Sequence, residues 1–487
     1  MSDILNVSTY SDVAAPGAVG YSAGTTADTG DLRRKFNFGD RVSELSLSQD
    51  PFFRVLNMVS KKPTDDPQFK FTERRGSYHK RYAYCEAVGS AFGTDGGSTL
   101  INNTAGTTAY FKMYTDWDAS GNKTNITGQA STVYAGTNSQ PEFFIPGQIV
   151  KVNTNTVADS TTATDYQLIK ITNVDLGTTG YAKLTGTIIK AAADASVYTM
   201  NATITGISGS GTNSLSPEAL DASKCYVVGT AFDEGSGYPE TWDDQPFSTS
   251  YGRTQIWKSS MAMNNTDRAT VLKYEGNEWA RIWKEKLIEH KWDIEQSLLF
   301  GRQDETYRTT QGAVDWIGVY GNAFSLDIAT KTQDDFLDDL SSYLDPRYNN
   351  GMATVFFVNT ATYNWLHKLG GYFNNNLSIG SNFRADFAVM GKKKVMGLDA
   401  TTISTVYGDM NVVRNIHLDG TNVKMLGINM IYCAYRPLVG NGINRDTSVY
   451  VGVQTLENSG VDRRVDQILT EAGMEWCCPE THAVWTA

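Results

Sequence analysis

The amino-acid sequence predicts a mixed α+β fold, and three observations carry this prediction. The stretch from Asp267 to Arg302 contains no proline and has apolar residues at helical spacing. The region between about residues 95 and 235 is rich in Gly, Thr, Asn and Ser and contains short strand-like runs. Residues 315–440 alternate strand-like and helix-like patterns. One long helix between a β-rich region and an α/β region is therefore the main feature to explain.

The composition of the chain excludes several classes of protein. The chain has 487 residues, of which 40% are hydrophobic, and its net charge is −11. The acidic balance argues against a dedicated nucleic-acid binder, which usually carries a basic stripe. No apolar run approaches the roughly 20 residues of a membrane span, and the start "MSDILNVSTYSDVAAPG" lacks the features of a secretory signal. The five cysteines have no zinc-site spacing, which predicts reduced thiols in a cytoplasm.

The first part of the chain predicts arms rather than a domain. Residues 1–30 are small and polar, so we expect them to order only against another surface. Short helical or turn segments follow, punctuated by Pro51 and Pro63. The aromatic and basic stretch 68–88 predicts a long exposed strand, and residues 245–263 predict a second one.

Between these arms, strand-like runs recur with turn-rich spacers, as is typical of a small all-β barrel or sandwich. The string "IPGQIVKVN" predicts a turn that leads into an edge strand. Because the two arms flank residues 95–235, we interpret this unit as an insertion in a loop of the main fold.

The long helix is predicted to run from Asp267 to Arg302, about 50 Å, with Gly301 at its end. Apolar residues on the opposite side of the helix indicate that it is contacted from two sides. A drifting apolar stripe forms its predicted core: Leu272, Trp279, Trp283, Leu287, Ile294 and Leu298.

Charged residues on other faces of this helix predict two ion pairs one turn apart, Arg281 with Glu285 and Lys291 with Glu295.

The remaining residues predict an α/β unit followed by strands. "RTTQGAVDWI" (308–317) predicts a turn into a strand, and residues 330–346 predict a helix. Residues 353–369 predict a buried strand, a Thr/Asn cap and a helix. The chain end predicts strand, turn and strand.

The sequence offers no persuasive catalytic constellation. His290 has no acid–base partner in its surroundings, and the string "DDFLDD" (334–339) fits the solvated face of a short helix better than a cation site. Cys477 and Cys478 with His482 make only half a metal motif. We therefore expect no catalytic residue, no metal and no cofactor, and we do not expect an enzyme.

The order of elements resembles the major capsid proteins of tailed bacteriophages, which have the HK97-like fold. "FNFGDRVSELSLSQDPFFRVL" with "PQFKFTERR" resembles the arm-to-loop region of one such family. "RTTQGAVDWI", "TVFFVNTATYNWLHKL" and "DRRVDQILTEAGMEWCCPETHAVW" resemble its post-helix segment, its axial strand–helix and its closing strands. The resemblance covers nearly the whole chain apart from residues 95–235.

The resemblance implies a layout: an N-terminal arm (1–60), an extended loop (E-loop; 61–94 and 236–263), an inserted all-β domain (95–235), a peripheral domain with a long spine helix (264–319 and 436–487) and an axial domain (320–435). It also implies that basic residues of the extended loop contact neighbouring subunits: Arg74, Arg75, Lys80, Arg81, Arg253 and Lys258.

The implied function is that of a self-assembling icosahedral shell around double-stranded DNA, assembled in a bacterial cytoplasm. The expected partners are other copies in hexamers and pentamers, a separate scaffolding protein, a portal protein, a decoration protein and the packaged DNA by non-specific contact. We expect no membrane partner, no extensive proteolytic removal and no covalent crosslinks. Two alternatives stay open: an encapsulin-like nanocompartment, and a surface adhesin that uses the β insertion.

Overall fold

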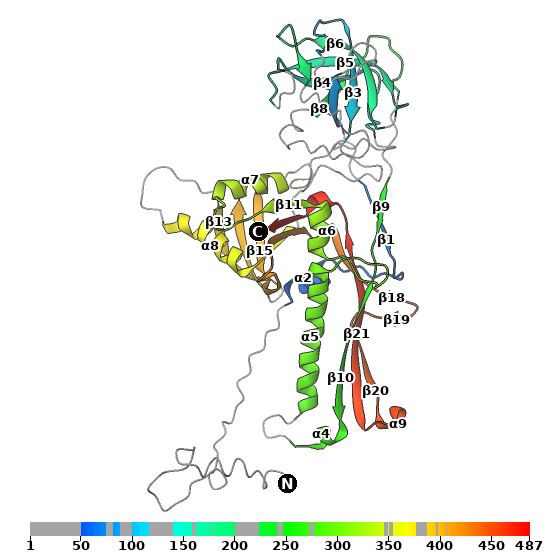
Figure 1. The fold of residues 1–487 in the computed structure, drawn as a ribbon, viewed down its shortest axis with the longest axis vertical. Coiled ribbons are helices and arrows are strands. Elements are labelled where there is room, and N and C mark those ends of the chain that lie inside the picture. Colours follow the sequence, from blue (N-terminus) through cyan, green and yellow to red (C-terminus); the bar gives the residue numbers. More distant parts are fainter. Residues whose placement is uncertain are drawn as a thin grey trace, which may run out of the picture.

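The computed structural model describes residues 50–74, 81–87, 100–115, 140–157, 162–178, 180–199, 224–240, 247–271, 277–344, 349, 354–375, 387–395, 398–405 and 407–487. These residues form an elongated molecule with a β-barrel at one end and a long helix beside a sheet reaching toward the other (Figure 1). The mixed α+β class is confirmed.

The barrel contains seven antiparallel strands in the order β5-β6-β3-β2-β8-β4-β7, and an additional β4–β5 pairing closes it. Alternating side chains point inward and form a separate core that includes Phe111, Val152 and Leu184. The strands are β2 (Tyr82–Ala87), β3 (Thr108–Tyr114), β4 (Gln148–Asn155), β5 (Asp165–Asp175), β6 (Ala182–Lys190), β7 (Tyr198–Thr199) and β8 (Lys224–Thr230).

The barrel confirms one of the two β architectures predicted for this region and corrects two details. The predicted edge strand is β4, which pairs with β8 on one side and with β5 on the other. Residues 82–87 were expected in an extended arm, but they pair with β3 and β8 inside the barrel. Their alternation places Ala83 and Cys85 in the barrel core, which explains the difference.

A short antiparallel ribbon of β1 (Lys70–Glu73) and β9 (Ser248–Tyr251) lies between the barrel and the rest of the molecule (Figure 1). Among the described residues of the second expected arm, β9 is the part that pairs with the first. The strand β10 (Gln255–Asn264) instead joins a four-stranded sheet and pairs along ten residues with β21 (Arg463–Trp476). The ribbon is therefore shorter than the sequence predicted.

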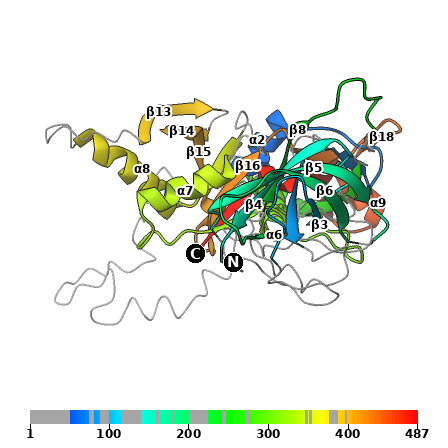
Figure 2. The same ribbon diagram turned by 90° about the horizontal axis from the view of Figure 1, so that it is seen from above.

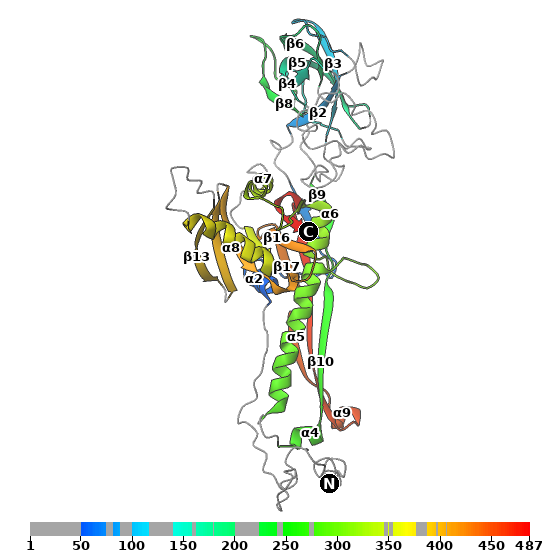
Figure 3. The ribbon, with the colours of Figure 1, turned by 60° about the vertical axis from the view of Figure 1, so that its left-hand side comes forward.

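The four-stranded sheet is completed by β17 (Cys433–Pro437) and β20 (Ser448–Gln454), which both pair with β21. The helix α5 (Glu278–Phe300) lies along β10, as Figure 3 shows. Short elements flank this sheet: α4 (Asn265–Ala269), α9 (Leu456–Ser459), β18 (Val439–Gly440) and β19 (Ile443–Asn444).

The prediction of one helix from Asp267 to Arg302 is wrong. The chain forms the short helix α4, leaves helical geometry at Thr270, and starts α5 only at Glu278. Asn277 caps α5, because its side-chain oxygen accepts a hydrogen bond from the Ala280 amide at 3.2 Å. With 23 residues, α5 is about 35 Å long.

A seven-stranded mixed sheet forms the third unit, in the order β11-β22-β16-β12-β15-β14-β13. Seen from above, β13 and α8 lie to one side, away from the barrel (Figure 2). The strands are β11 (Asn322–Ser325), β12 (Thr354–Val358), β13 (Phe387–Val395), β14 (Leu398–Thr405), β15 (Gly408–Arg414), β16 (Val423–Asn429) and β22 (Ala483–Thr486).

Helices α7 (Gln333–Tyr343) and α8 (Thr360–Asn375) confirm two predictions. The predicted Thr/Asn cap of α8 is also confirmed, because the Asn359 side chain accepts from the Thr362 amide at 2.8 Å. The predicted strand near residues 308–317 is wrong: Ala313–Tyr320 form the helix α6. Its buried residues Ala313 and Ile317 are four apart, which is a helical spacing.

Candidate intersubunit surfaces and the cluster around Glu295

The basic residues predicted to contact neighbouring subunits do not form one site. Arg74 is exposed beside the ribbon, with its guanidinium carbon 5.5 Å from the ring centre of Phe247. Arg81 is exposed just before β2, and Lys258 is exposed on β10. Arg253 pairs within the chain, with Glu305 at 2.9 Å. Arg75 and Lys80 lie outside the described residues.

The predicted core stripe of the long helix divides into two parts. Ile294 and Leu298 are fully buried in the main core. Trp279, Trp283 and Leu287, nearer the start of α5, are only half-buried in the single chain. Leu272 lies outside the described residues. The first half of α5 therefore keeps apolar surface that a neighbouring subunit can cover.

Trp279 is the first residue of that stripe that the structure describes, and its ring contacts two arginines. The guanidinium carbons of Arg464 and Arg268 lie 5.1 Å and 5.7 Å from its ring centre. These cation–π contacts fasten α4 and β21 to the start of α5.

A groove of about 500 Å³ lies between the ribbon and α6. Phe71 and Tyr251 line it from the ribbon, and Val319 and Tyr320 line it from α6. Trp476 contributes from β21. Tyr251, Val319 and Tyr320 are each about half exposed, at 49%, 55% and 55%. Glu73, Arg302 and Asp315 share the walls with these aromatic side chains, and an open groove of such mixed lining suits contacts with another protein.

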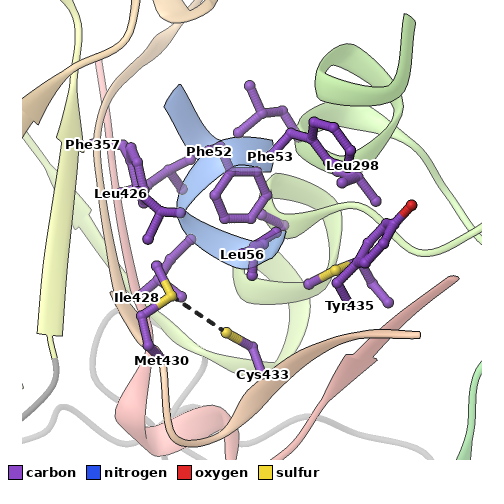
Figure 4. Packing of buried hydrophobic residues seen from close by; sticks show 14 of the residues in the cluster. Phe52, Phe53, Leu56, Leu298, Phe357, Leu426, Ile428, Met430, Cys433 and Tyr435 are labelled. Carbon is purple, nitrogen blue, oxygen red and sulfur yellow. Dashed lines mark hydrogen bonds between the residues drawn. The ribbon is translucent and has the colours of Figure 1, made fainter. Parts of the chain in front are cut away.

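Sequence reasoning missed the cluster around Glu295. Here α2 (Pro51–Val59) packs its apolar face into the main core against α5 and the two sheets (Figure 4). Phe52 makes an edge contact with Phe357, with ring centres 5.3 Å apart. Figure 4 shows Phe52, Phe53 and Leu56 pointing toward Leu298, Leu426 and Tyr435.

At the start of α2, the Glu295 carboxylate takes the place of a cap. The Phe52 and Phe53 amides donate to its two oxygens at 3.1 Å and 2.6 Å, and Asn415 Nδ2 donates at 2.8 Å. Asp50 precedes the helix but makes no side-chain cap bond. The expected pair with Lys291 is absent among the described residues, whereas Arg281 does pair with Glu285, at 2.5 Å.

A signal for this role was present in the sequence. Glu295 follows Trp292 by three residues and precedes Leu299 by four, so it lies on the second apolar face of the helix. A carboxylate on such a face is buried with partners or excluded from the core. The sequence could not show that the partners would be backbone amides 243 and 242 residues away.

Possible reactive groups in the described residues are engaged in structural contacts. His290 is buried between Ser259, at 2.9 Å, and Thr470, at 2.8 Å, and desolvation lowers its pKa. This chain of polar groups resembles a catalytic triad only superficially, because it contains no carboxylate and joins α5 to the sheet inside the core. It fastens the helix to β10 and β21.

The side chains of Cys477, Cys478 and His482 are not arranged as a metal-binding group. No group of metal-binding side chains occurs in the part of the chain that the structure describes. The Asn429 amide donates to His482 Nδ1 at 3.3 Å, and Nε2 faces the Cys477 carbonyl at 3.2 Å. Burial lowers the pKa of His482 to about 4, so it is neutral at neutral pH.

The aspartates of "DDFLDD" serve different structural roles. Asp335 completes the capping box of α7 with Thr332. Asp339 pairs with Lys331 at 2.8 Å and accepts from Trp485 Nε1 at 3.1 Å. The expectation of one solvated face is thus wrong for Asp339, whose side chain is only 14% exposed. None of the described helices is long and apolar enough to cross a membrane.

The chain is similar to capsid proteins in sequence. A curated major capsid protein of Pseudomonas phage PaMx41 is 25% identical over 287 residues, which is 54% of this chain and 65% of that protein. The aligned part therefore spans slightly less than two thirds of that relative.

Solved structures give a weaker likeness. A chain from the capsid structure of the cyanophage P-SCSP1u has a TM-score of 0.36 and 11% identity, covering 53% of this chain and 79% of that one. A chain of the holo-SrpI encapsulin complex from Synechococcus elongatus PCC 7942 has a TM-score of 0.35 and 8% identity, covering 51% and 77%. These TM-scores are too low to carry an argument.

The family described as SU10 major capsid protein matches residues 20–487, nearly the whole chain. This match confirms the resemblance to phage major capsid proteins and the expectation of a protein without enzymatic activity. The chain belongs to the SU10 major capsid protein family, whose members are structural proteins of the phage virion capsid.

Proposed function

We propose that this protein is the repeating subunit of an icosahedral shell, built from hexamers and pentamers, that encloses the double-stranded DNA of a tailed phage. The observation that carries the proposal is the family match over residues 20–487. The half-buried apolar surface on the first half of α5 supports it, because a neighbouring subunit could cover the part of Trp279 and Trp283 that is still accessible in the single chain.

The proposed layout is HK97-like. The ribbon β1–β9 would be the extended loop, α5 with the four-stranded sheet the peripheral domain, and the seven-stranded sheet with α7 and α8 the axial domain. The barrel would be an insertion between the two ribbon strands. Its separate hydrophobic core and its place beyond the ribbon support this assignment (Figure 1).

We propose that Arg74, Arg81 and Lys258 contact a neighbouring subunit. Their exposure supports this role. Arg253 is a weaker candidate because Glu305 already neutralises it within the chain. Pairing of these basic residues with acidic residues at the edge of an intersubunit interface would affect the rate and specificity of assembly more than its total free energy.

The proposed partners beyond other copies are a separate scaffolding protein, a portal protein and a decoration protein on the outer face of the barrel. Packaged DNA would be contacted through its phosphates without sequence preference. Such contacts should weaken with added salt, because phosphate binding releases counterions.

Electron microscopy of the purified chain tests the shell directly. We expect shells, tubes or capsomers, with closed shells when scaffolding protein is co-expressed. A chain that stays monomeric with scaffolding protein would contradict the proposal. Particles that enclose enzymes rather than DNA would favour the nanocompartment instead.

A matched pair of variants tests the contact residues. Lys258→Glu should slow assembly without changing the melting temperature of the unassembled chain, because Lys258 is exposed. Lys368→Glu is the control, at an exposed lysine of α8 that lies outside the proposed contact surfaces. Equal effects of the two variants would contradict a specific role for Lys258. Denaturing gels of mature particles test the non-covalent linkage, and a ladder of multimers would contradict it.

A further inference from the structure

The helix α2 forms a cover over a buried carboxylate. Glu295 is 0% exposed, and its two oxygens accept hydrogen bonds from the Phe52 and Phe53 amides and from Asn415. Two of these three donors belong to α2 itself. If α2 leaves its site, water reaches Glu295 and those two donors are lost together.

Three charged or titratable groups lie around Glu295. Asp50 precedes α2 and is 6% exposed, and Arg54 pairs with Asp50 at 2.9 Å rather than with Glu295. His417, in the 3-10 turn Ile416–Leu418, hydrogen-bonds through Nδ1 to Gln296 at 2.9 Å. No ion pair to Glu295 occurs in the described ranges.

The strand β17 also packs on α2 and brings Cys433 and Tyr435 into this core, whereas its charged residue Arg436 pairs with Glu475. Burial raises the pKa of the Cys433 thiol to about 12 and raises the pKa of Tyr435 well above its usual value. Both side chains therefore stay neutral across the neutral range. Glu295 is a buried carboxyl group with hydrogen-bond donors but without a counter-charge.

Such a group is expensive to ionise in place. Desolvation, with a smaller contribution from the charge of Asp50, raises the pKa of Glu295 to about 7 although the three hydrogen bonds oppose the shift. Oε2 accepts only one of the three bonds, so its second lone pair is available for a proton.

We propose that docking of α2 is linked to uptake of one proton from solvent by Glu295, so that α2 undocks more often as the pH rises through neutrality. In the docked state the carboxyl group is protonated in mild acid. In the undocked state it is hydrated and ionised.

Hydrogen exchange of the full-length, unassembled chain tests this link. Amides of residues 52–56 are compared at pH 6.0 and 8.5, after correction for the intrinsic exchange rate at each pH. A carboxyl group titrating near 7 when docked and near 4.5 when hydrated predicts that the undocking constant rises about tenfold between these pH values. Equal corrected protection at both pH values would overturn the proposal.

Variants assign the effect to Glu295. Glu295→Gln should abolish the pH dependence, and Glu285→Gln, an exposed glutamate of the same helix, should leave it unchanged. If Glu295→Gln retains the tenfold change, the proposal is wrong.

A variant of His417 tests whether Glu295 or His417 causes the pH dependence, and this test does not require the Glu295 variant to fold. His417→Gln should keep the tenfold change. Asp50→Asn should keep the direction of the pH dependence but reduce its size between pH 6.0 and 8.5, because removing the Asp50 charge eases ionisation of Glu295 and lowers the midpoint. Loss of the pH dependence in His417→Gln would assign it to the imidazole and overturn the proposal.

Discussion

Phe69 lies against Gly473 at the base of the ribbon, where no side chain would fit. A Cβ atom on Gly473 would stand 2.9 Å from Cε1 of Phe69 and 2.4 Å from the carbonyl oxygen of Arg253. The Arg436 guanidinium carbon also lies 5.6 Å from the centre of the Phe69 ring. The ring thus fixes the point from which β1 and β9 leave the sheet.

Gly473→Ala should therefore destabilise the chain by about 1–3 kcal/mol, because the close neighbour is backbone and cannot rotate away. Gly318→Ala is the control, since a Cβ at Gly318 on α6 meets nothing within 4 Å. It should be neutral or stabilise by up to about 1 kcal/mol. Urea unfolding of the unassembled chains measures both, and equal stabilities would contradict the packing described for Phe69.

The two halves of α5 should respond differently to truncation. Leu298→Ala removes a fully buried side chain and should cost about 2–5 kcal/mol in the free energy of unfolding. Trp283→Ala should cost clearly less in the unassembled chain, because Trp283 is half-buried there. If Trp283→Ala costs as much as Leu298→Ala without assembly, the first half of α5 is not an open surface.

The helix shows what periodicity alone can predict. The apolar spacing from Leu272 to Leu298 satisfied a helical pattern, so the break between α4 and α5 was invisible to it. Asn277 was the relevant signal, since its side chain caps α5. One capping residue is a weak sign of a helix start when the apolar spacing continues across it. The contacts of Trp279 with Arg268 and Arg464 favour the break between α4 and α5, and they are tertiary contacts that the sequence does not show.

The barrel could be predicted in part from the sequence, whereas the role of Glu295 could not. Strict alternation of apolar and polar residues, as in β6, predicts a strand and shows which of its two faces is buried. The all-β class of this region could therefore be predicted from local sequence pattern. Closure by β4 and β5 depends on pairing between strands, which local pattern does not encode. The role of Glu295 depends on amides of α2, so only the folded chain reveals it.

The barrel should unfold as a unit separate from the rest of the molecule, because its core residues form their own cluster. Phe111 is 2% exposed, so Phe111→Ala should reduce the free energy of unfolding of the barrel by about 3–5 kcal/mol. In calorimetry, only the melting temperature of the barrel transition should fall. Phe356→Ala, in the seven-stranded sheet, is the matched variant and should lower only the other transition. A single transition shifted equally by both variants would contradict two independent cores.

His482 makes the closing strands sensitive to acid. Its ring is fully buried, Nδ1 accepts from the Asn429 amide, and desolvation lowers its pKa to about 4. An imidazole in the unfolded chain titrates near 6.5. Between these values the unfolded chain binds more protons than the folded one, so stability falls as the pH falls.

The loss due to His482 should begin below about pH 6.5 and reach up to about 3 kcal/mol near pH 4. Glu295 acts in the opposite sense over part of this range, since its raised pKa stabilises the folded chain as the pH falls from about 7. The His482 contribution is therefore measured as the difference between wild type and His482→Gln in urea unfolding from pH 7 to pH 4. Glutamine offers both an acceptor for the Asn429 amide and a donor for the Cys477 carbonyl, but it takes up no proton. The variant should lose less stability than wild type on acidification, and parallel curves would show that His482 is not the acid-sensitive group.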